Sequence, residues 1–295
     1  MTILNSATEG LPPELIVLAR AVAESGAIDK EAVVEVCSVD GRARLSGSLS
    51  RWTSLGLFIE TDRGIALNKV AQPKPREDID PWTARLPSIL RRLVFEGANF
   101  APLFGPDPSS CGISADFVRG LAWILAQDIY QISPLWKDMD ALEARQLQTA
   151  DKVLQNDVRW NALRFWARYL GFAGTHRNFF VDPTSVLRDE IGEMLTLNTP
   201  LSADAFVRGL AHRIPVLDGG TARASVEEKL DPKEWKRPNP GELSMSLSFA
   251  LRRLELEQVI SLEKRSDTAQ GFFLVGKGNR RSQSFTHVVL LAAAR

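Results

Sequence analysis

The sequence contains few cysteines and few histidines. Its 295 residues include two cysteines, Cys37 and Cys111, and neither belongs to a CxxC pair. Two cysteines are too few for a disulfide framework, and this usage is typical of a reducing compartment. The three histidines, His176, His212 and His287, are not spaced from a cysteine, a glutamate or one another as zinc ligands are. We therefore predict no bound metal and no other cofactor.

Long hydrophobic runs are also missing. No stretch approaches the roughly 18 consecutive apolar residues that a membrane-spanning helix needs. The first apolar stretch is not preceded by a basic segment, and Pro12 and Glu14 interrupt it, so it does not resemble a signal peptide. These features predict a cytoplasmic protein without a membrane partner.

The common catalytic motifs are absent as well. There is no GxSxG, and neither cysteine lies in a recognisable nucleophile context. The segment Gly276-Lys277-Gly278 follows an apolar run, but it lacks the GxxxxGK[ST] spacing of a phosphate-binding loop. The sequence thus favours a protein that is not an enzyme. An enzyme is still possible if its active site is assembled from residues of different domains.

Charge is balanced overall but uneven along the chain. The formal net charge is zero, with 36 basic and 36 acidic residues. Neutrality disfavours a protein that coats nucleic acid without specificity, because such binding grows with the number of phosphates neutralised. Residues 201–295, however, carry 15 basic and 11 acidic side chains, a net charge of +4. This local excess indicates a surface for an anionic partner.

An internal repeat organises the chain. Residues 113–122 (ISADFVRGLA) recur as residues 201–211 (LSADAFVRGLA) with one inserted alanine. A second pair of segments, 162–172 and 250–260, is separated by 88 residues, which agrees with the first pair to within that insertion. Two matches at a common offset make duplication a better explanation than chance. A third, shorter copy at 48–58 aligns without gaps on the second pair.

The three copies share three apolar columns. These are Leu49, Leu163 and Leu251, then Trp52, Trp166 and Leu254, and then Phe58, Phe172 and Ile260. The first two columns are three residues apart and so form one stripe on a helix. The third column is expected to begin a β-strand in each copy.

A polar turn and a second apolar run follow each copy, which predicts a β-hairpin. The turns are Thr61–Gly64, Gly174–Asn178 and Lys264–Gln270. Ahead of the first copy, residues 13–25 and 30–37 are expected to form helices, the second capped by Asp29. This is the order of a winged helix. We predict a mainly α protein with short β-hairpins (α+β), built from tandem winged-helix-type modules and a helical connecting segment.

The expected domains are continuous along the chain. They are an N-terminal winged-helix domain (1–70), a proline-rich charged linker (71–81), a helical segment with a second winged-helix-like module (82–198) and a C-terminal winged-helix-like domain (199–295). Within the last domain, the loop-like stretch 229–240 is interpreted as an elaborated turn before the third helix.

Winged helices bind DNA by placing the third helix in the major groove and the wing against phosphate or the minor groove. Basic and hydroxyl side chains on these two elements are therefore candidate nucleic-acid contacts. In the first module they are Arg42, Arg44 and Arg51 on the helix and Arg63 in the wing. In the last module they are Ser244, Ser248, Arg252 and Arg253 on the helix, Lys264 and Arg265 in the wing, and Lys277, Arg280 and Arg281 after it. The charge excess makes the last module the preferred DNA contact.

Two other interpretations stay open. Exposed arginines are usually only solvated, and winged helices often bind proteins, so the chain could be a protein–protein adaptor that never contacts DNA. Phe165, Trp166 and Tyr169 leave little polar surface on the helix of the second copy, which favours packing there. A transcriptional regulator is the third hypothesis, and such a protein usually binds a two-fold operator as a dimer.

The opening residues TILNSATEGLPPELIVLAR (2–20), the segment RWTSLGLF (51–58) and the overall length resemble the DpdG proteins. The resemblance implies a component of bacterial Dpd gene clusters, which insert 7-deazaguanine bases into DNA and restrict DNA that lacks them. It implies helicase-like and nuclease-like protein partners and supplies no catalytic residues to carry over. The combined hypothesis is a non-catalytic subunit of a DNA modification or restriction (phage-defence) system, which binds double-stranded DNA or acts as a scaffold.

Overall fold

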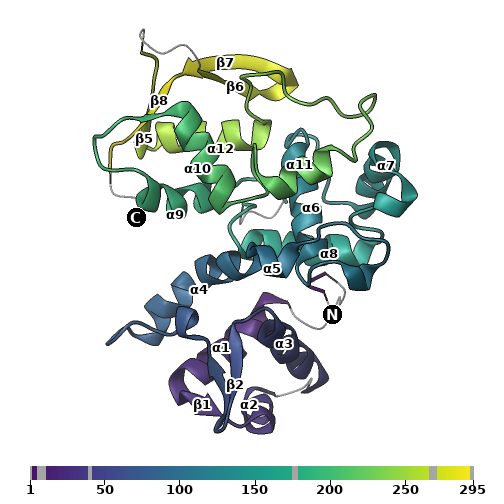
Figure 1. Cartoon of the computed structure of the whole chain (residues 1–295), viewed down its shortest axis with the longest axis vertical. Helices are drawn as coiled ribbons and strands as arrows, with labels where there is room; N and C mark the ends of the chain where they lie inside the picture. The colour runs from purple at the N-terminus through teal and green to yellow at the C-terminus, as the bar shows by residue number, and fades with distance from the viewer. Residues whose placement is uncertain (1, 5–10, 39–41, 175–178, 266–270, 293–295) are drawn as a thin grey trace. The chain divides into compact units, whose positions relative to one another are not determined.

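The computed structural model describes residues 2–4, 11–38, 42–174, 179–265 and 271–292. The chain is mainly helical with small antiparallel sheets, which confirms the α+β class (Figure 1). Two compact units each take two stretches of the chain: residues 1–117 with 156–170, and residues 118–155 with 171–295. No helix in these described ranges is long and apolar enough to cross a membrane.

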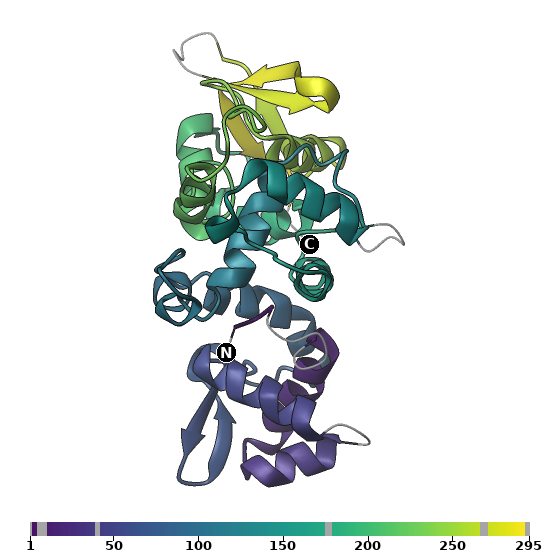
Figure 2. The same ribbon diagram turned by 90° about the vertical axis from the view of Figure 1, so that its right-hand side faces the viewer.

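The first unit opens with three helices and a three-stranded sheet. In chain order these are α1 (Pro12–Ser25), β1 (Ala27–Ile28), α2 (Lys30–Cys37), α3 (Arg42–Ser54), β2 (Phe58–Thr61) and β3 (Gly64–Leu67). The sheet has the antiparallel order β1-β3-β2, and the β2–β3 hairpin projects beside the helices (Figure 2). Asp29 caps α2 as expected, because its carboxylate accepts hydrogen bonds from the backbone of Glu31 and Ala32.

Further helices complete the first unit. They are η1 (Lys69–Ala71), α4 (Ile79–Val94), α5 (Gly97–Phe100), η2 (Pro108–Ser110) and α8 (Asp157–Tyr169). The indole N–H of Trp82 in α4 donates to the carbonyl oxygen of Ala71 at 2.8 Å. The buried guanidinium of Arg91 donates to the carbonyl oxygen of Leu170 at 2.9 Å. Both bonds satisfy polar groups inside the unit, and they tie α4 to η1 and to the end of α8.

The second unit combines helices with two small sheets. Its helices are α6 (Ala115–Ala126, from Val118 onward), α7 (Trp136–Gln146), η3 (Thr149–Asp151), α9 (Thr184–Met194), α10 (Ala203–Arg213), α11 (Thr221–Glu227), α12 (Met245–Leu256) and η4 (Lys277–Asn279). Its strands are β4 (Leu201–Ser202), β5 (Ile260–Glu263), β6 (Phe272–Gly276), β7 (Arg280–Phe285) and β8 (His287–Leu290). One sheet has the order β4-β8-β5, and β6 pairs with β7.

The strand pairing of the last copy differs from the expectation. We expected the strand after α12 to form a hairpin with the run that begins at Gly271. Instead β5 pairs with β8, and the β6–β7 hairpin is inserted between them. The buried residues of β5, Ile260 and Leu262, lie opposite Leu290 and Val288 of β8. The apolar side chains of β8 therefore complete the core beside β5.

The first and last copies share the same helix-to-strand turn. The backbone N–H of Leu57 donates to Trp52 O, and the N–H of Val259 donates to Leu254 O in the equivalent positions. Gly56 and Gln258 occupy the same place in the turn with φ of 86° and 57°. Phe58 and Ile260 begin their strands as expected.

The second copy departs from this pattern. Its positive-φ residue is Gly171, and the following bridge joins Ala173 to Val181, so the expected strand start at Phe172 is wrong by one residue. Within the described ranges this copy has an isolated bridge where a hairpin was expected. Residues 175–178 of the expected turn, and residues 266–270 of the turn after β5, lie outside the described residues.

Candidate nucleic-acid interface

Helix α3 presents part of its expected contact face to solvent. Arg42, Arg44 and Ser46 are exposed in its first half. Arg42 forms an ion pair with Glu35 of α2 at 2.9 Å, with both side chains well exposed. Arg63 is exposed in the turn between β2 and β3. The helix face and the hairpin tip thus each carry accessible cations.

The prediction that Arg51 contacts DNA at the surface is wrong. Its side chain is only 1% exposed. It follows the fully buried Ser48 by three residues, and residues three apart lie on one side of a helix. The inward-facing side of α3 therefore includes Arg51, and its guanidinium does not reach a surface ligand.

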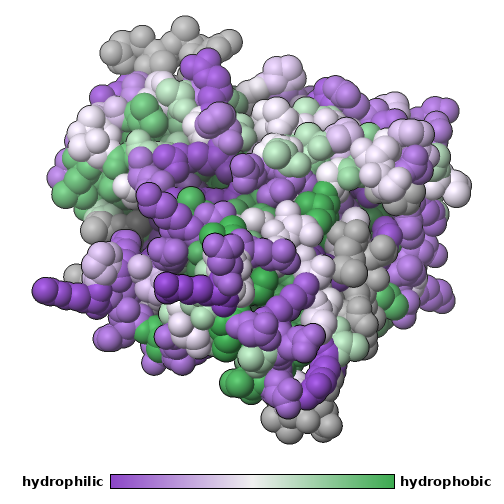
Figure 3. Space-filling view, turned by 60° about the horizontal axis from the view of Figure 1, so that its bottom comes forward, coloured by the Kyte–Doolittle hydropathy of each residue, from purple (hydrophilic) through white to green (hydrophobic). Residues whose placement is uncertain are grey.

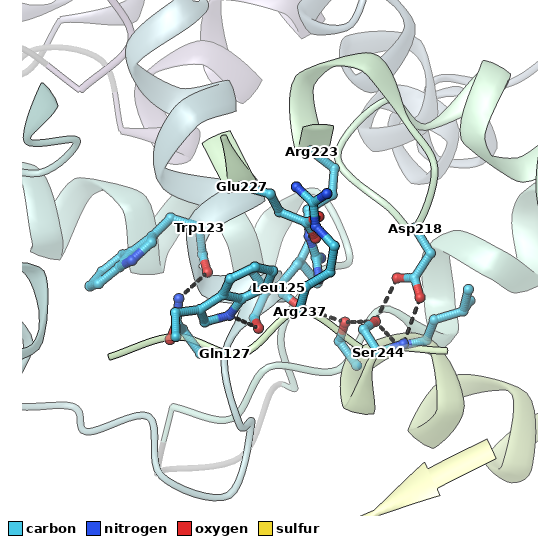
Figure 4. Close-up of polar contacts among 12 residues, drawn as sticks. Trp123, Leu125, Gln127, Asp218, Arg223, Glu227, Arg237 and Ser244 are labelled. Atoms are coloured by element: carbon cyan, nitrogen blue, oxygen red, sulfur yellow. Dashed lines mark hydrogen bonds and ion pairs between the residues drawn. The ribbon is translucent and has the colours of Figure 1, made fainter. Parts of the chain in front are cut away.

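Ser244 and Ser248 are also wrong as DNA contacts, because both are buried. Ser244 caps α12 by accepting from the N–H of Leu247, and its hydroxyl donates to the Asp218 carboxylate at 2.5 Å (Figure 4). The hydroxyl of Ser248 accepts from the N–H of Val275 in β6 at 2.9 Å. Strand β6 packs on α12 (Figure 1), so these hydroxyls serve the backbone inside the fold.

Arg252 and Arg253 of α12 remain partly exposed, but carboxylates engage them. Arg252 lies 2.6 Å from a Glu255 oxygen. Arg253 contacts Asp182 at 2.5 Å and Glu257 at 3.0 Å. The hydrogen bond with Glu257 raises the pKa of Arg253. A DNA phosphate must therefore compete with these carboxylates for both guanidinium groups.

The β6–β7 hairpin carries two accessible cations. Lys277 lies in its turn and Arg280 begins β7; both are exposed, and neither side chain has a hydrogen bond or ion pair within the described ranges. Lys264, just after β5, is exposed and unpaired in the same sense. Arg265 instead pairs with Glu263 at 2.7 Å.

Arg281 is half exposed but held in place. Its side chain is 51% exposed, and its Nε donates to a Glu242 oxygen at 2.5 Å. Its guanidinium carbon also lies 4.7 Å from the ring centroid of Phe273 on the partner strand, a cation–π contact. The hydrogen bond from Arg281 lowers the pKa of Glu242. Arg281 therefore links the hairpin to the loop before α12.

A polar pocket of about 690 Å³ lies beside this hairpin, and sequence analysis missed it. Its walls include the ends of α6 and α7, the start of α12 and residues Val275 and Asn279. Seven consecutive residues, Lys233 to Asn239, complete the lining. They belong to the stretch interpreted as an elaborated turn. The indole N–H of Trp235 donates to the carbonyl oxygen of Ala126 at 2.9 Å and anchors this loop.

An ion-pair triad positions one pocket arginine. The Glu227 carboxylate contacts the buried Arg223 at 2.5 Å and Arg237 of the pocket wall at 3.2 Å (Figure 4). Arg223 is buried and fixes the Glu227 carboxylate, which in turn orients the guanidinium of Arg237. No group of three or more His, Cys, Asp or Glu side chains could hold a metal ion, as far as the described residues extend.

A family model described as DpdG-like matches residues 1–268. The chain belongs to the DpdG-like family. This match confirms the resemblance carried by residues 2–20 and 51–58. No curated protein and no solved structure matches the chain.

The DpdG-like match ends before β6 begins at Phe272. Most of the pocket lining lies inside the matched range, whereas Lys277, Arg280 and Arg281 lie outside it. The hairpin therefore lies outside the part of the chain that the family model covers. The lysines, arginine and tryptophan of residues 233–237 were visible in the sequence. Their partners from α6 and α7 were not, because only the fold brings them together.

Proposed function

We propose that this DpdG-like protein is a DNA-binding subunit of a Dpd-type DNA modification or restriction system, and that the β6–β7 hairpin contacts DNA. This proposal rests on two exposed cations of the hairpin, Lys277 and Arg280, which have no side-chain hydrogen bond or ion pair within the described ranges. Phosphate binding by such cations releases condensed counterions, which drives association. Lys264 adds a third accessible charge on the same unit.

We further infer a winged-helix module at the N-terminus as a second DNA contact. The order α1-β1-α2-α3-β2-β3 and the sheet order β1-β3-β2 support this inference. In such a module α3 enters the major groove and the β2–β3 hairpin is the wing. Arg42, Arg44 and Arg63 are exposed on these two elements. Charge is less favourable here than on the hairpin, since Glu60 and Asp62 flank the wing tip.

The test is binding of the full chain to a fluorescent 30-base-pair duplex across a salt series. The variant Lys277→Glu/Arg280→Glu removes the open hairpin cations and spares Arg281, whose ring contact and ion pair support the fold. The matched control Lys137→Glu/Arg208→Glu changes the net charge equally at exposed positions of α7 and α10 in the same unit.

We expect affinity at least tenfold weaker in the hairpin variant. Its salt slope should be smaller by about 2, one for each phosphate that the variant no longer neutralises. The control should bind nearly as the native chain does. Absence of binding at low salt contradicts the DNA-binding function. Equally weakened binding in both variants contradicts the assignment to the hairpin.

A protein–protein adaptor is the second candidate function. The packing of α12 favours this role. The equivalent helix of a winged helix contacts DNA, but α12 packs against β6, and its arginines are paired with carboxylates. On the face drawn in Figure 3, hydrophobic residues form small patches separated by hydrophilic ones. An adaptor would therefore rely on polar contacts on that face. Co-purification with the other proteins of a Dpd-type cluster, in the absence of DNA binding, is the result that favours this role.

A further inference from the structure

The pocket beside the β6–β7 hairpin has carboxylates that are already engaged. Asp128 accepts hydrogen bonds from the N–H of Tyr130 at 3.0 Å and from the side-chain amide of Gln131 at 2.9 Å. Glu242 accepts from Arg281 at 2.5 Å and from the side-chain amide of Asn239 at 2.8 Å. The third lining carboxylate, Glu234, lies 3.7 Å from Arg145.

The lining cations are more open than the carboxylates. Lys233 and Lys236 are exposed, and within the described ranges neither side chain forms an ion pair or hydrogen bond. Arg237 keeps a 60% exposed side chain while Glu227 orients it. The lining carboxylates are engaged by other groups, whereas Lys233 and Lys236 have no partner within the described ranges. The positive charge of these lysines is therefore available to bind an anion.

Part of the lining is apolar and buried. Trp235, Leu243 and Met245 are each less than one-tenth exposed. They provide a floor against which a flat, largely apolar ring can pack. At the rim, one side-chain amide N–H of Gln131 and one of Asn239 donate to carboxylates, so each amide keeps a carbonyl oxygen and a second N–H for a ligand.

A closed ring of hydrogen bonds stiffens one wall. The indole N–H of Trp123 donates to Gln146 Oε1 at 2.9 Å, and Gln146 Nε2 donates to Gln127 Oε1 at 2.9 Å. Gln127 Nε2 then donates to the carbonyl oxygen of Trp123 at 3.0 Å (Figure 4). Both glutamines are buried and line the pocket. A wall whose rotamers are fixed in advance binds a ligand with less loss of entropy.

We propose that this pocket binds a nucleoside monophosphate unit, with the base against the apolar floor and the phosphate at Lys233 and Lys236. The volume of about 690 Å³ falls within the usual range for small-molecule sites, about 300–1,000 Å³. A planar ring that carries hydrogen-bonding groups, joined to an anion, matches the floor, the rim amides and the lysines together. The unit is either a free mononucleotide or one nucleotide of a strand. The proposal stands whether or not the hairpin binds duplex DNA.

Calorimetric titration of the full chain tests this site. The probes are the four deoxynucleoside monophosphates, inorganic phosphate, a twelve-nucleotide single strand and the same strand with abasic sites. The variant Lys233→Glu/Lys236→Glu alters exposed side chains and is not expected to disturb the fold. Lys137→Glu/Arg208→Glu is again the charge-matched control, since neither residue lines the pocket.

We expect at least one mononucleotide, or the intact strand, to bind at least tenfold more tightly than phosphate or the abasic strand respectively. We also expect the Lys233/Lys236 variant to lose at least tenfold in that affinity while the control keeps it. Mononucleotide binding identifies a free ligand, and binding of the strand alone identifies a nucleotide within a chain. Equal affinity for phosphate or the abasic strand overturns the proposal, as does an unchanged affinity in the variant. Absence of any binding at millimolar concentration overturns it as well.

Discussion

The indole rings of Trp52 and Trp166 lie 5.3 Å apart, centroid to centroid, with an interplanar angle of 43°. The two tryptophans occupy the same column of the internal repeat, the first in α3 and the second in α8. Both are buried, so equivalent helices of two copies pack against each other inside the first unit. The helix of the second copy therefore works as core, in line with its aromatic composition.

Replacement of Trp166 should destabilise the first unit. Trp166→Ala removes a buried indole and leaves a cavity beside Trp52, which costs about 3–5 kcal/mol of unfolding free energy. The neighbouring Phe165→Ala is the matched control, because Phe165 is 51% exposed on the same helix and its removal should change stability by about 0.5 kcal/mol or less. Urea denaturation followed by tryptophan fluorescence measures both. Similar destabilisation in the two variants would show that the tryptophan pair is not part of a cooperative core.

The Glu77 carboxylate should titrate far below its ordinary range. Arg85 donates two hydrogen bonds to it at 2.7 and 2.5 Å, and the N–H of Lys74 donates a third at 2.8 Å. These contacts lower the pKa of Glu77 from 4.5 to about 2. Because the folded pKa is depressed, the stabilisation is complete above pH 4.5 and is lost as the pH falls toward 2.

Carboxyl-carbon NMR measures this pKa directly. In Arg85→Met the side-chain hydrogen bonds disappear and only the Lys74 N–H remains, so the pKa of Glu77 should move up toward its ordinary value. Lys69→Met, which removes an exposed cation elsewhere in the unit, should leave that pKa unchanged. A native Glu77 that titrates near 4.5 would refute the ion-pair geometry.

Local patterns explain why the strand starts at Phe58 and Ile260 were predicted correctly. An apolar stripe fixes each helix, and the turn that ends it recurs at Gly56 and Gln258. The partner of β5 was not predictable in the same way. Two apolar runs follow β5, and the nearer one, β6, pairs with β7. Only the fit of Val288 and Leu290 into the core selects the later strand, and that fit is a tertiary property.

For the candidate interface too, local sequence predicted the secondary structure of each residue, whereas its exposure depended on tertiary packing. The sequence placed Ser248 and Arg51 on helices, but it could not tell which side of each helix the rest of the fold covers. Burial is set by β6 for Ser248 and by the core of the first unit for Arg51. Lys277 and Arg280 were identifiable because a basic segment that contains glycine and serine directly after an apolar run is a local pattern.

Asp116 and Asp204 occupy the same position of the repeat but have different surroundings, which makes them a matched pair. Asp116 is 2% exposed and accepts hydrogen bonds from the N–H groups of Ile3 at 3.2 Å and Leu4 at 2.8 Å. It therefore holds the N-terminal segment against α6. Asp204 is exposed and pairs with Arg208 one helical turn away.

We expect Asp116→Ala to cost about 1–3 kcal/mol of unfolding free energy, because buried backbone donors lose their acceptor. Asp204→Ala should cost less than about 1 kcal/mol, since exposed ion pairs contribute little. Amide hydrogen exchange at Leu4 should accelerate in the first variant alone, and thermal unfolding gives the stability change. If Asp116→Ala leaves exchange at Leu4 unchanged, another group holds the N-terminal segment. In that case the duplicated aspartate has not acquired a structural role at this position.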